Sequence, residues 1–404
     1  MRVVPRRDLE QALNGDEPHT VECAAYVLAR AQHVRAKRRA VEHCEALARE
    51  VYALQADCLP LREQDTPGAS VMQATLQERA SHLVDRIFWL VSALSDESTS
   101  EAIQRSLRGE DAVARANAAE TLEVITTPRL AQLIGPLLEG ADVSTLAHIA
   151  QEKLGRPIPT VWQVCEPFRR VSAFESVENN EWIAAISLYM LMEALKSKES
   201  SDAADDEVAS RDQVVEMLRV TAETASPLLR ETARLALARL DARARRARAE
   251  ETMTVLEEVI FLKQVPFFQE MSTSDLRVLA GISEEATYEA GQQIIAQGKR
   301  GDALYVIVSG RVAIQRRKRT AAEATLTDLA ALGPRNYFAE MSLFDDEPHS
   351  ADAIALTNTH VILVRRAPLM ALIKRQPDLA ISLFKVLSQR LRQANAALAK
   401  KQKK

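Results

Sequence analysis

The stretch FAEMSLFDDEPHSA, residues 338–351, decides the fold of the C-terminal part of this chain. Before it, apolar residues alternate with period two, which is typical of strands with one buried face, and glycines interrupt the pattern. Val306, Val308 and Val312 mark strands, and Gly298 and Gly310 mark turns. A short helix beginning near residue 340 would direct free backbone N–H groups at an anion such as a phosphate. The sequence therefore predicts a small β-roll over residues 284–366 with an anion-binding cassette at its centre.

Helices are predicted on both sides of this roll. Met253–Phe261 is amphipathic, and Ser272–Ala280 starts from a Ser/Thr cap. Pro368–Arg375 and Pro377–Leu398 follow the roll. The last helix carries an apolar stripe that either pairs with a second copy of the chain or packs on the roll. Its members are Leu379, Leu383, Val386, Leu387 and Leu391. The basic run Arg316–Arg319 falls where we expect a solvated hairpin loop.

The N-terminal part of the chain carries a weak internal repeat over residues 8–240. In each copy a polar loop leads into an alanine-rich helix with apolar residues at helical spacing. The copies are Asp16–Ala31, Glu110–Ile125, Asn179–Ala194 and Thr224–Leu240. Long helices at roughly 35–57 and 71–94 interrupt them. The pattern resembles HEAT repeats and predicts an α-solenoid, with a helical bundle of the same periodicity as the alternative.

Composition and charge narrow the classes of function. Hydrophobic residues make up 47% of the chain, the net charge is −4 and the isoelectric point is about 6.1. This balance is typical of a soluble protein and argues against nucleic acid as the main partner, because nucleic-acid binding leaves a basic footprint. The sequence has no HExxH, GxSxG or P-loop motif, so we expect no enzyme activity and no cofactor.

Cysteine spacing and hydropathy point to a cytoplasmic protein without a metal site. The four cysteines are far apart and form no CxxC pair, so we expect reduced thiols and no metal ligands. The most apolar windows, Ile87–Leu94 and Trp182–Met192, are much shorter than the ~20 residues needed to cross a bilayer. The first residues show no signal peptide. We therefore expect no transmembrane segment.

The roll and its cassette closely resemble the cyclic nucleotide-binding domain of the catabolite activator, kinase regulatory subunit and cyclic nucleotide-gated channel families. The resemblance implies cyclic AMP or cyclic GMP as ligand. In these families the glutamate at the position of Glu340 accepts a hydrogen bond from the ribose 2′-hydroxyl, and an arginine pairs with the cyclic phosphate. The implied ligand contacts in this chain are Ala339, Glu340, Met341, Ser342, His349, Ser350 and Ala351.

Two of these positions depart from the family pattern. Ala339 replaces a glycine, and its methyl group is expected to crowd the approach of the sugar. His349 replaces the arginine, so the permanent charge and the two-pronged phosphate contact are lost. A charge-assisted hydrogen bond contributes about 1.5–3 kcal/mol, so this loss would weaken affinity about 10- to 150-fold. Three outcomes remain open: no ligand, a weak or altered ligand, or a phosphate contact that depends on pH.

The order of the parts resembles the soluble region of bacterial proteins related to ATP/ADP translocases. We predict an α + β multidomain chain with HEAT-like helical repeats over residues 1–240, a helical linker over 241–252, a cyclic nucleotide-binding-like domain over 253–399 and a basic tail over 400–404. The predicted function is that of a non-enzymatic sensor whose solenoid docks a protein partner. The alternatives are a ligand-free structural adaptor and the soluble regulatory part of a nucleotide-transporter system at a membrane.

Overall fold

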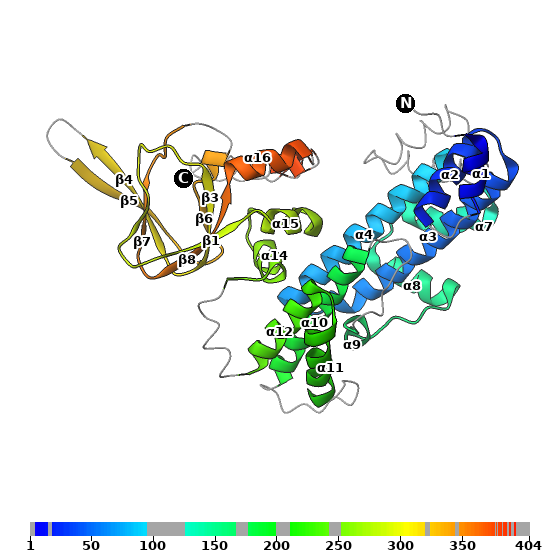
Figure 1. Ribbon diagram of the computed structural model, residues 1–404, viewed down its shortest axis with the longest axis horizontal. Coiled ribbons are helices and arrows are strands. Elements are labelled where there is room, and N and C mark those ends of the chain that lie inside the picture. The colour runs from blue at the N-terminus through cyan, green and yellow to red at the C-terminus, as the bar shows by residue number, and fades with distance from the viewer. Residues whose placement is uncertain are drawn as a thin grey trace, which may run out of the picture. The chain divides into compact units, whose positions relative to one another are not determined.

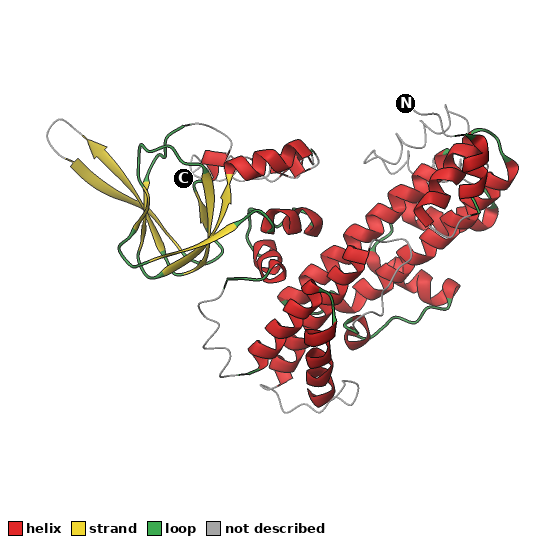
Figure 2. Cartoon of the chain, in the orientation of Figure 1, coloured by secondary structure: helices red, strands yellow, loops and turns green. Residues whose placement is uncertain are grey.

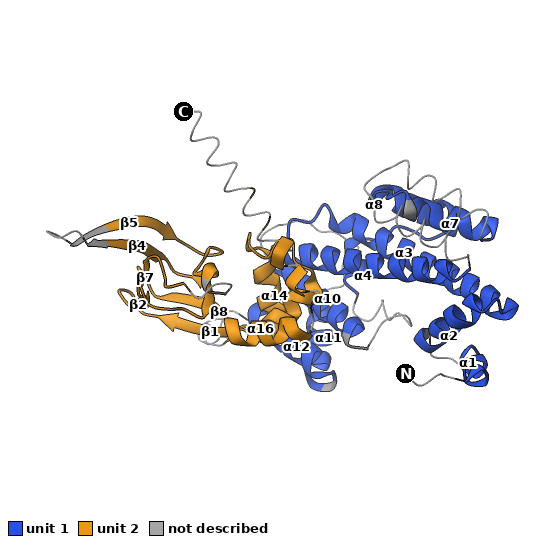
Figure 3. Ribbon diagram, turned by 90° about the horizontal axis from the view of Figure 1, so that it is seen from above, with its two compact units in different colours: residues 1–241 blue, residues 242–404 orange. Residues whose placement is uncertain are grey.

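The chain divides into two compact units, Met1–Asp241 and Ala242–Lys404, which Figure 3 colours separately. The computed structural model describes residues 5–14, 18–94, 126–166, 177–198, 211–241, 252–319, 324–343 and 347–375, with separate residues between 377 and 392. The repeat copy at 110–125, most of the predicted linker and the tail at 400–404 lie outside the described residues.

The first unit is helical in all its described elements (Figures 1 and 2). Its helices are α1 (Arg6–Ala12), α2 (Pro18–Arg30), α3 (Val34–Leu61), α4 (Pro67–Ser92), α7 (Pro128–Leu138), α8 (Val143–Leu154), α9 (Val161–Val164), α10 (Val177–Lys198), α11 (Arg211–Thr224) and α12 (Pro227–Leu240). The two long helices predicted at 35–57 and 71–94 are confirmed as α3 and α4. They pack along each other, and α2 and α8 pack on α3.

Side-chain caps explain where several of these helices begin. The Thr66 hydroxyl accepts the N–H of Ala69 at the start of α4, and the first helical residue is a proline, whose fixed φ suits that position. The Asp142 carboxylate accepts the N–H of Thr145 at the start of α8 in the same way. These signals are local, so the sequence alone can place such helix starts.

Alanine allows close helix packing in this unit. Ala36, Ala40, Ala48 and Ala56 of α3 are fully buried, which brings the neighbouring helices close to its backbone. Three of the four predicted repeat copies contain a helix, which is α2, α10 or α12. The structure thus shows a helical N-terminal unit, and the finer HEAT-like solenoid stays a prediction.

The second unit starts with two short helices, α14 (Val255–Lys263) and α15 (Thr273–Ala280). The hydroxyl of Thr254 accepts the N–H of Glu257, whose carboxylate accepts the N–H of Thr254 in return. Ser272 caps α15 by accepting the N–H of Asp275. Both predicted helices before the roll are confirmed, with ends shifted by one or two residues.

The roll consists of two antiparallel four-stranded sheets. Its elements are β1 (Glu284–Tyr288), β2 (Gln293–Ile295), β3 (Ala303–Ser309), β4 (Val312–Arg319), β5 (Ala324–Leu332), β6 (Tyr337–Phe338), the 3₁₀ helix η2 (Glu340–Leu343), β7 (Asp352–Ala355), β8 (Thr359–Arg365) and the helix α16 (Arg366–Arg375). One sheet has the order β1-β8-β3-β6 and the other β2-β7-β4-β5. Their inner faces share a core that includes Ile295, Ile307, Val312, Phe338, Ala353, Val361 and Leu363. The predicted β-roll is confirmed.

The expected loop at Arg316–Arg319 is wrong, because these residues belong to β4 and pair with β5 as far as Arg319 and Ala324. The neighbouring strand β7 pairs with β4 only up to Gln315 and Asp352. The end of β4 therefore extends past β7, and Arg316 and Arg317 are exposed there, so a strand can continue through a basic run.

The last helix is only partly described. Leu379 and Leu383 of its apolar stripe are buried, whereas Val386, Leu387 and Leu391 lie outside the described residues. Burial of the first two agrees with packing inside the chain, and pairing with a second copy stays a prediction. No helix in the described part of the chain is both long and apolar enough to cross a membrane.

Candidate functional site

The cassette begins in β6, which pairs with β3 and forms the edge of one sheet. Phe338 pairs with Tyr305 in the antiparallel ladder, and their rings stack with centroids 5.1 Å apart and planes 6° from parallel. Phe338 is 6% exposed and belongs to the core shared by the two sheets. The first residue of the cassette is therefore held by both backbone and ring contacts.

Ala339 has a left-handed backbone, with φ of 63°. An L-residue with a Cβ pays about 1–2 kcal/mol for this conformation, whereas glycine adopts it freely. The methyl group packs against the core of the roll. Sequence reasoning expected this alanine to crowd the sugar of a ligand, and the structure adds a backbone strain that the sequence did not indicate.

The helix predicted near residue 340 is confirmed as η2, a single 3₁₀ turn from Glu340 to Leu343. Glu340 is half-buried, and the Met341 side chain is 63% exposed. Residue 342 is in η2, but its side chain lies outside the described ones. The turn packs on β3, one of the two inner strands of its sheet.

The second half of the cassette is held by its backbone to the loop after β2. The N–H of Gly298 donates to the carbonyl of His349 at 2.9 Å, and the N–H of His349 donates to the carbonyl of Lys299 at 2.9 Å. Gly298 has φ of 80°, which lets the loop turn toward His349. Ser350 is exposed and Ala351 is half-buried. Residues 349–351 are thus placed by pairing with residues 298–299.

Burial lowers the pKa of the His349 imidazole below its usual value, and the nearby Asp302 carboxylate acts in the opposite direction. Imidazole is already mostly neutral at pH 7 with an ordinary pKa of about 6.5. The structure therefore places a neutral ring at the position where the resemblance implies a permanent cation. A phosphate contact through the imidazolium would need acidic conditions.

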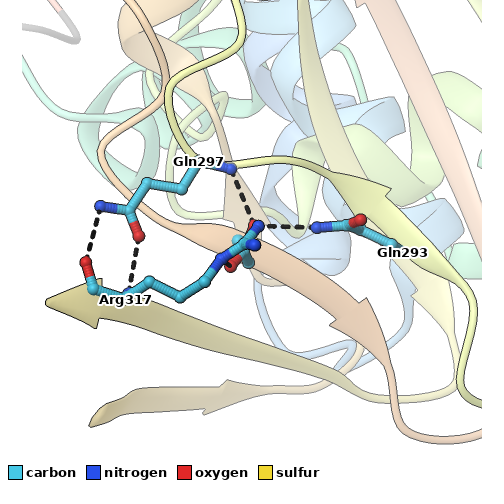
Figure 4. A network of polar contacts seen from close by, with 4 residues as sticks. Gln293, Gln297 and Arg317 are labelled. Carbon is cyan, nitrogen blue, oxygen red and sulfur yellow. Dashed lines mark hydrogen bonds and ion pairs between the residues drawn. The ribbon is translucent and has the colours of Figure 1, made fainter. Parts of the chain in front are cut away.

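Sequence reasoning missed a polar network beside the cassette, which Figure 4 shows. Asp352, directly after the cassette, is 3% exposed, and its two carboxylate oxygens accept Nε and Nη2 of Arg317, each at 2.6 Å. The bond from Arg317 holds the pKa of this carboxyl below its usual range. A signal was available, because an acid opens a strand whose other members, Ala353–Ala355, are apolar.

The three buried thiols offer no reactive site. Burial raises the pKa of Cys58 and that of Cys165 to about 12, and it raises that of Cys44 as well. Cys23 is exposed, and none of the four cysteines, all of them in the described part of the chain, forms a disulfide. No group of three or more histidine, cysteine or acidic side chains in the described part of the chain could hold a metal ion.

Comparison with known proteins identifies the roll. The family model for the cyclic nucleotide-binding domain matches residues 285–376. The cyclic AMP receptor protein of Thermus thermophilus is 35% identical over 137 residues, which are 34% of this chain and 62% of that protein. The CRP-like cAMP-activated global transcriptional regulator of Mycobacterium tuberculosis is 33% identical over 138 residues, which are 34% of this chain and 60% of that protein.

A solved structure covers a similar share of the chain. The crystal structure of the Thermus thermophilus catabolite activator protein has 34% sequence identity, covers 33% of this chain and 62% of that chain, and gives a TM-score of 0.29. The chain thus spans 62% and 60% of the length of the two curated relatives named above. From the matched range and the fold of its strands, the C-terminal unit of this chain contains a cyclic nucleotide-binding domain.

Proposed function

We propose that this chain is a non-enzymatic regulatory protein whose roll binds cyclic AMP or cyclic GMP and whose helical unit docks a partner protein. One observation carries the proposal: both halves of the cassette are held in place within a matched cyclic nucleotide-binding domain. Phe338 pairs with β3, and His349 pairs with the loop at 298–299. A ligand would shift the population of the unit's conformations and so alter what the rest of the chain presents.

The residues of the cassette can supply most of the contacts that the ligand class needs. The Glu340 carboxylate can accept a ribose hydroxyl hydrogen bond, and the exposed Ser350 hydroxyl can donate to a phosphate oxygen. The neutral His349 ring replaces a permanent charge, so binding is weak at pH 7. The sensor therefore responds to a high concentration of nucleotide or prefers a ligand with a different anionic group.

The test is calorimetric titration of the full chain with cyclic AMP and with cyclic GMP, beside its His349→Arg variant. We expect weak binding by the native chain and affinity about 10-fold or more higher in the variant. The matched control is His148→Arg, the same change at an exposed histidine of α8 in the helical unit. Absence of binding in both the native chain and His349→Arg, with circular dichroism unchanged, would contradict the proposal.

The ligand-free adaptor is the second candidate, and two observations favour it. Ala339 strains the backbone where the family pattern has glycine, and the pKa of His349 is lowered. In this role the roll itself serves as an interaction surface. Titration of the native chain from pH 8 to pH 6 separates the two candidates further, because a sensor that uses the imidazolium gains affinity as pH falls, whereas the adaptor binds nothing.

The remaining parts of the proposal rest on sequence. A cytoplasmic location, the absence of enzyme activity and a main partner other than nucleic acid follow from the motifs and from the net charge of −4. The two curated relatives are named as a receptor and a transcriptional regulator, so binding to duplex DNA at two salt concentrations is the direct check. Salt-sensitive DNA binding by the full chain would replace the protein partner with DNA.

A further inference from the structure

The Asp352 network consists of Gln293, Gln297, Arg317 and Asp352, and its centre is the carboxylate of Asp352. Besides the two bonds from Arg317, one carboxylate oxygen accepts Nε2 of Gln293 and the backbone N–H of Gln297, each at 2.8 Å. The carboxylate thus joins three segments that are far apart in sequence: β2 with its following loop, β4, and β7. Figure 4 shows the bonds converging on one point.

Gln297 connects the loop after β2 to the exposed end of β4. Its side-chain Oε1 accepts the backbone N–H of Arg317 at 2.6 Å, and its Nε2 donates to the Arg317 carbonyl at 3.2 Å. The amide of Gln297 therefore takes the place of a paired strand residue where β7 no longer accompanies β4. The two bonds to the Arg317 backbone fix the side chain of Gln297, and the bond to the Asp352 carboxylate fixes its backbone N–H.

The residues that follow Gln297 carry the second half of the cassette. Gly298 and Lys299 exchange two backbone hydrogen bonds of 2.9 Å with His349. Gly298 therefore follows Gln297 of the network directly and bonds to His349, the position where the resemblance implies the phosphate contact. On the other side, Asp352 lies next to Ala351, so the network holds the segment 349–351 from both directions.

The carboxylate and guanidinium of the network lie on the outer face of their sheet. Ala353 and Val312 belong to the core, and side chains alternate along a strand, so Asp352 and Arg317 point to the opposite face. The two side chains are thus on the face away from the core, whereas Ala339 of the cassette packs against that core. Any effect of the network on a ligand must pass through the backbone of residues 297–299 and 349–351.

We propose that Arg317, Asp352 and Gln297 are positioning residues of the cassette, which hold the backbone of His349 and Ser350 in the geometry that receives an anionic group. The proposal rests on the proposed function for its ligand, but the positioning itself concerns this chain alone. Supporting groups behind a binding residue typically change affinity by about 10-fold or more when they are removed. We expect that size of effect although none of the three touches the ligand.

The experiment compares Arg317→Gln and Asp352→Asn with the native full chain by amide hydrogen exchange. Exchange at Gly298 and His349 reports the two bonds that hold the cassette, and we expect it to rise about 10-fold or more in either variant. Arg317 is 53% exposed, so Arg317→Gln leaves the core intact even if Asp352→Asn unfolds the roll. The matched control is Arg311→Gln, the same loss of charge at the exposed residue just before β4.

Ligand affinity is measured separately by introducing Arg317→Gln into the His349→Arg variant and titrating cyclic AMP. We expect affinity to fall about 10-fold relative to His349→Arg alone, with no fall for Arg311→Gln in the same background. Native exchange rates at Gly298 and His349 in both network variants would overturn the positioning role. Faster exchange with unchanged affinity would overturn its bearing on the ligand.

The two proposals fail in distinguishable ways. If neither the native chain nor His349→Arg binds a cyclic nucleotide, the proposed function fails, and the exchange rates still decide whether the network positions the cassette. Arg317→Lys supplies a further check, because lysine keeps the charge without the two-pronged geometry. We expect an exchange rate between those of the native chain and Arg317→Gln, and a rate equal to that of Arg317→Gln would show that the geometry alone matters.

Discussion

The helical unit buries charged pairs between its helices, whereas the roll keeps its arginine partners near the surface. Glu22 of α2 is 1% exposed and is held by Arg86 of α4, and Arg79 of α4, 5% exposed, bonds to Glu50 of α3. In the roll, Arg317 is 53% exposed. A helix satisfies its own backbone groups, so only side chains can fix one helix against another. Strands are fixed by their ladder, so the roll depends more on backbone geometry.

The largest expected effect follows from removing one partner of a buried pair in the helical unit. Arg86→Met leaves the Glu22 carboxylate buried without its bidentate partner, which costs about 3–5 kcal/mol of unfolding free energy. All three tryptophans, Trp89, Trp162 and Trp182, lie in this unit, so tryptophan fluorescence in a denaturant titration of the full chain reports its unfolding alone.

An exposed pair on the same unit provides the control. Arg38 and Glu42 are neighbours on α3, and the Arg38 side chain is 83% exposed, so Arg38→Met is expected to cost less than about 0.5 kcal/mol. Adding Glu22→Gln to Arg86→Met should recover part of the loss, because the uncompensated charge disappears. Equal losses for Arg86→Met and Arg38→Met would show that burial of the pair does not matter.

The second effect tests the dependence of the roll on backbone geometry. Gly310 has φ of 89°, and a Cβ there would lie 2.5 Å from the carbonyl oxygen of Asn358 and 2.6 Å from the Cα of Thr359. These are backbone atoms that cannot move aside, so Gly310→Ala should cost about 3 kcal/mol from strain and overpacking together. Amide-exchange mass spectrometry of peptides from β3 and β8 measures the loss.

Two other glycines separate strain from collision. Gly291 has φ of 86° with open space around a Cβ, so Gly291→Ala should show only the strain of about 1–2 kcal/mol. Gly68 of α4 has an ordinary helical backbone, and its Cβ would lie 2.5 Å from the Glu193 carboxylate, the end of a side chain that can shift. If Gly310→Ala costs no more than Gly291→Ala, the close backbone approach of the β3–β4 turn to Asn358 and Thr359 is unimportant.

The third effect concerns a buried acid in the second unit. Glu258 of α14 is 5% exposed, and burial raises its pKa to about 7, with the Ser283 hydroxyl acting against the shift and the Glu285 carboxylate adding to it. A raised folded-state pKa favours the folded state below the ordinary value of 4.5, and this stability is lost as pH rises toward 7. At about 1.4 kcal/mol per pKa unit, the loss is about 3 kcal/mol.

Measured stability of the second unit should therefore fall between pH 4.5 and about 7, and Glu258→Gln should remove most of that slope. Amide exchange of peptides from α14 and β1, measured across this pH range, reports the stability of the second unit. His43 in the helical unit should change stability with pH in the opposite direction. Burial lowers the pKa of its imidazole, so the stability that this residue contributes is lost as pH falls below the ordinary value of 6.5. A Glu258→Gln variant with the native slope would contradict the protonation of this acid.

The smallest effect concerns a left-handed residue in each unit. Ala339→Gly should stabilise the roll by about 0.5–1 kcal/mol, because glycine removes the strain at φ of 63°, and its greater loss of chain entropy on folding offsets only part of that gain. Gln32 at the end of α2 has φ of 60°, and its side chain accepts a hydrogen bond from Lys37. Gln32→Gly should therefore gain less. Thermal unfolding of the full chain compares the two, and a loss of stability in Ala339→Gly would contradict the strain.

Much of the fold and of the cassette could be predicted because the signals are local. The cap at Ser272, the helix starts after Thr66 and Thr254, and the alternation before the cassette are each written within about ten residues. The prediction of a loop at Arg316–Arg319, the end of β4, was wrong for the same reason. A basic run of four residues indicates a loop when the strand that pairs with it is unknown. The Asp352 network joins residues 35 and 55 positions apart, which no local pattern reveals.

The sequence by itself determined roughly where the helices lie, where the roll turns, and that residues 285–376 match a cyclic nucleotide-binding domain. Only the tertiary structure decided that the pKa of His349 is lowered, that burial raises the pKa of Glu258 to about 7, and that Asp352 ties β4 to the cassette. The physical reason is that caps and turns depend on neighbouring residues. The charge state of a side chain depends instead on how much water and which partners the rest of the fold leaves around it.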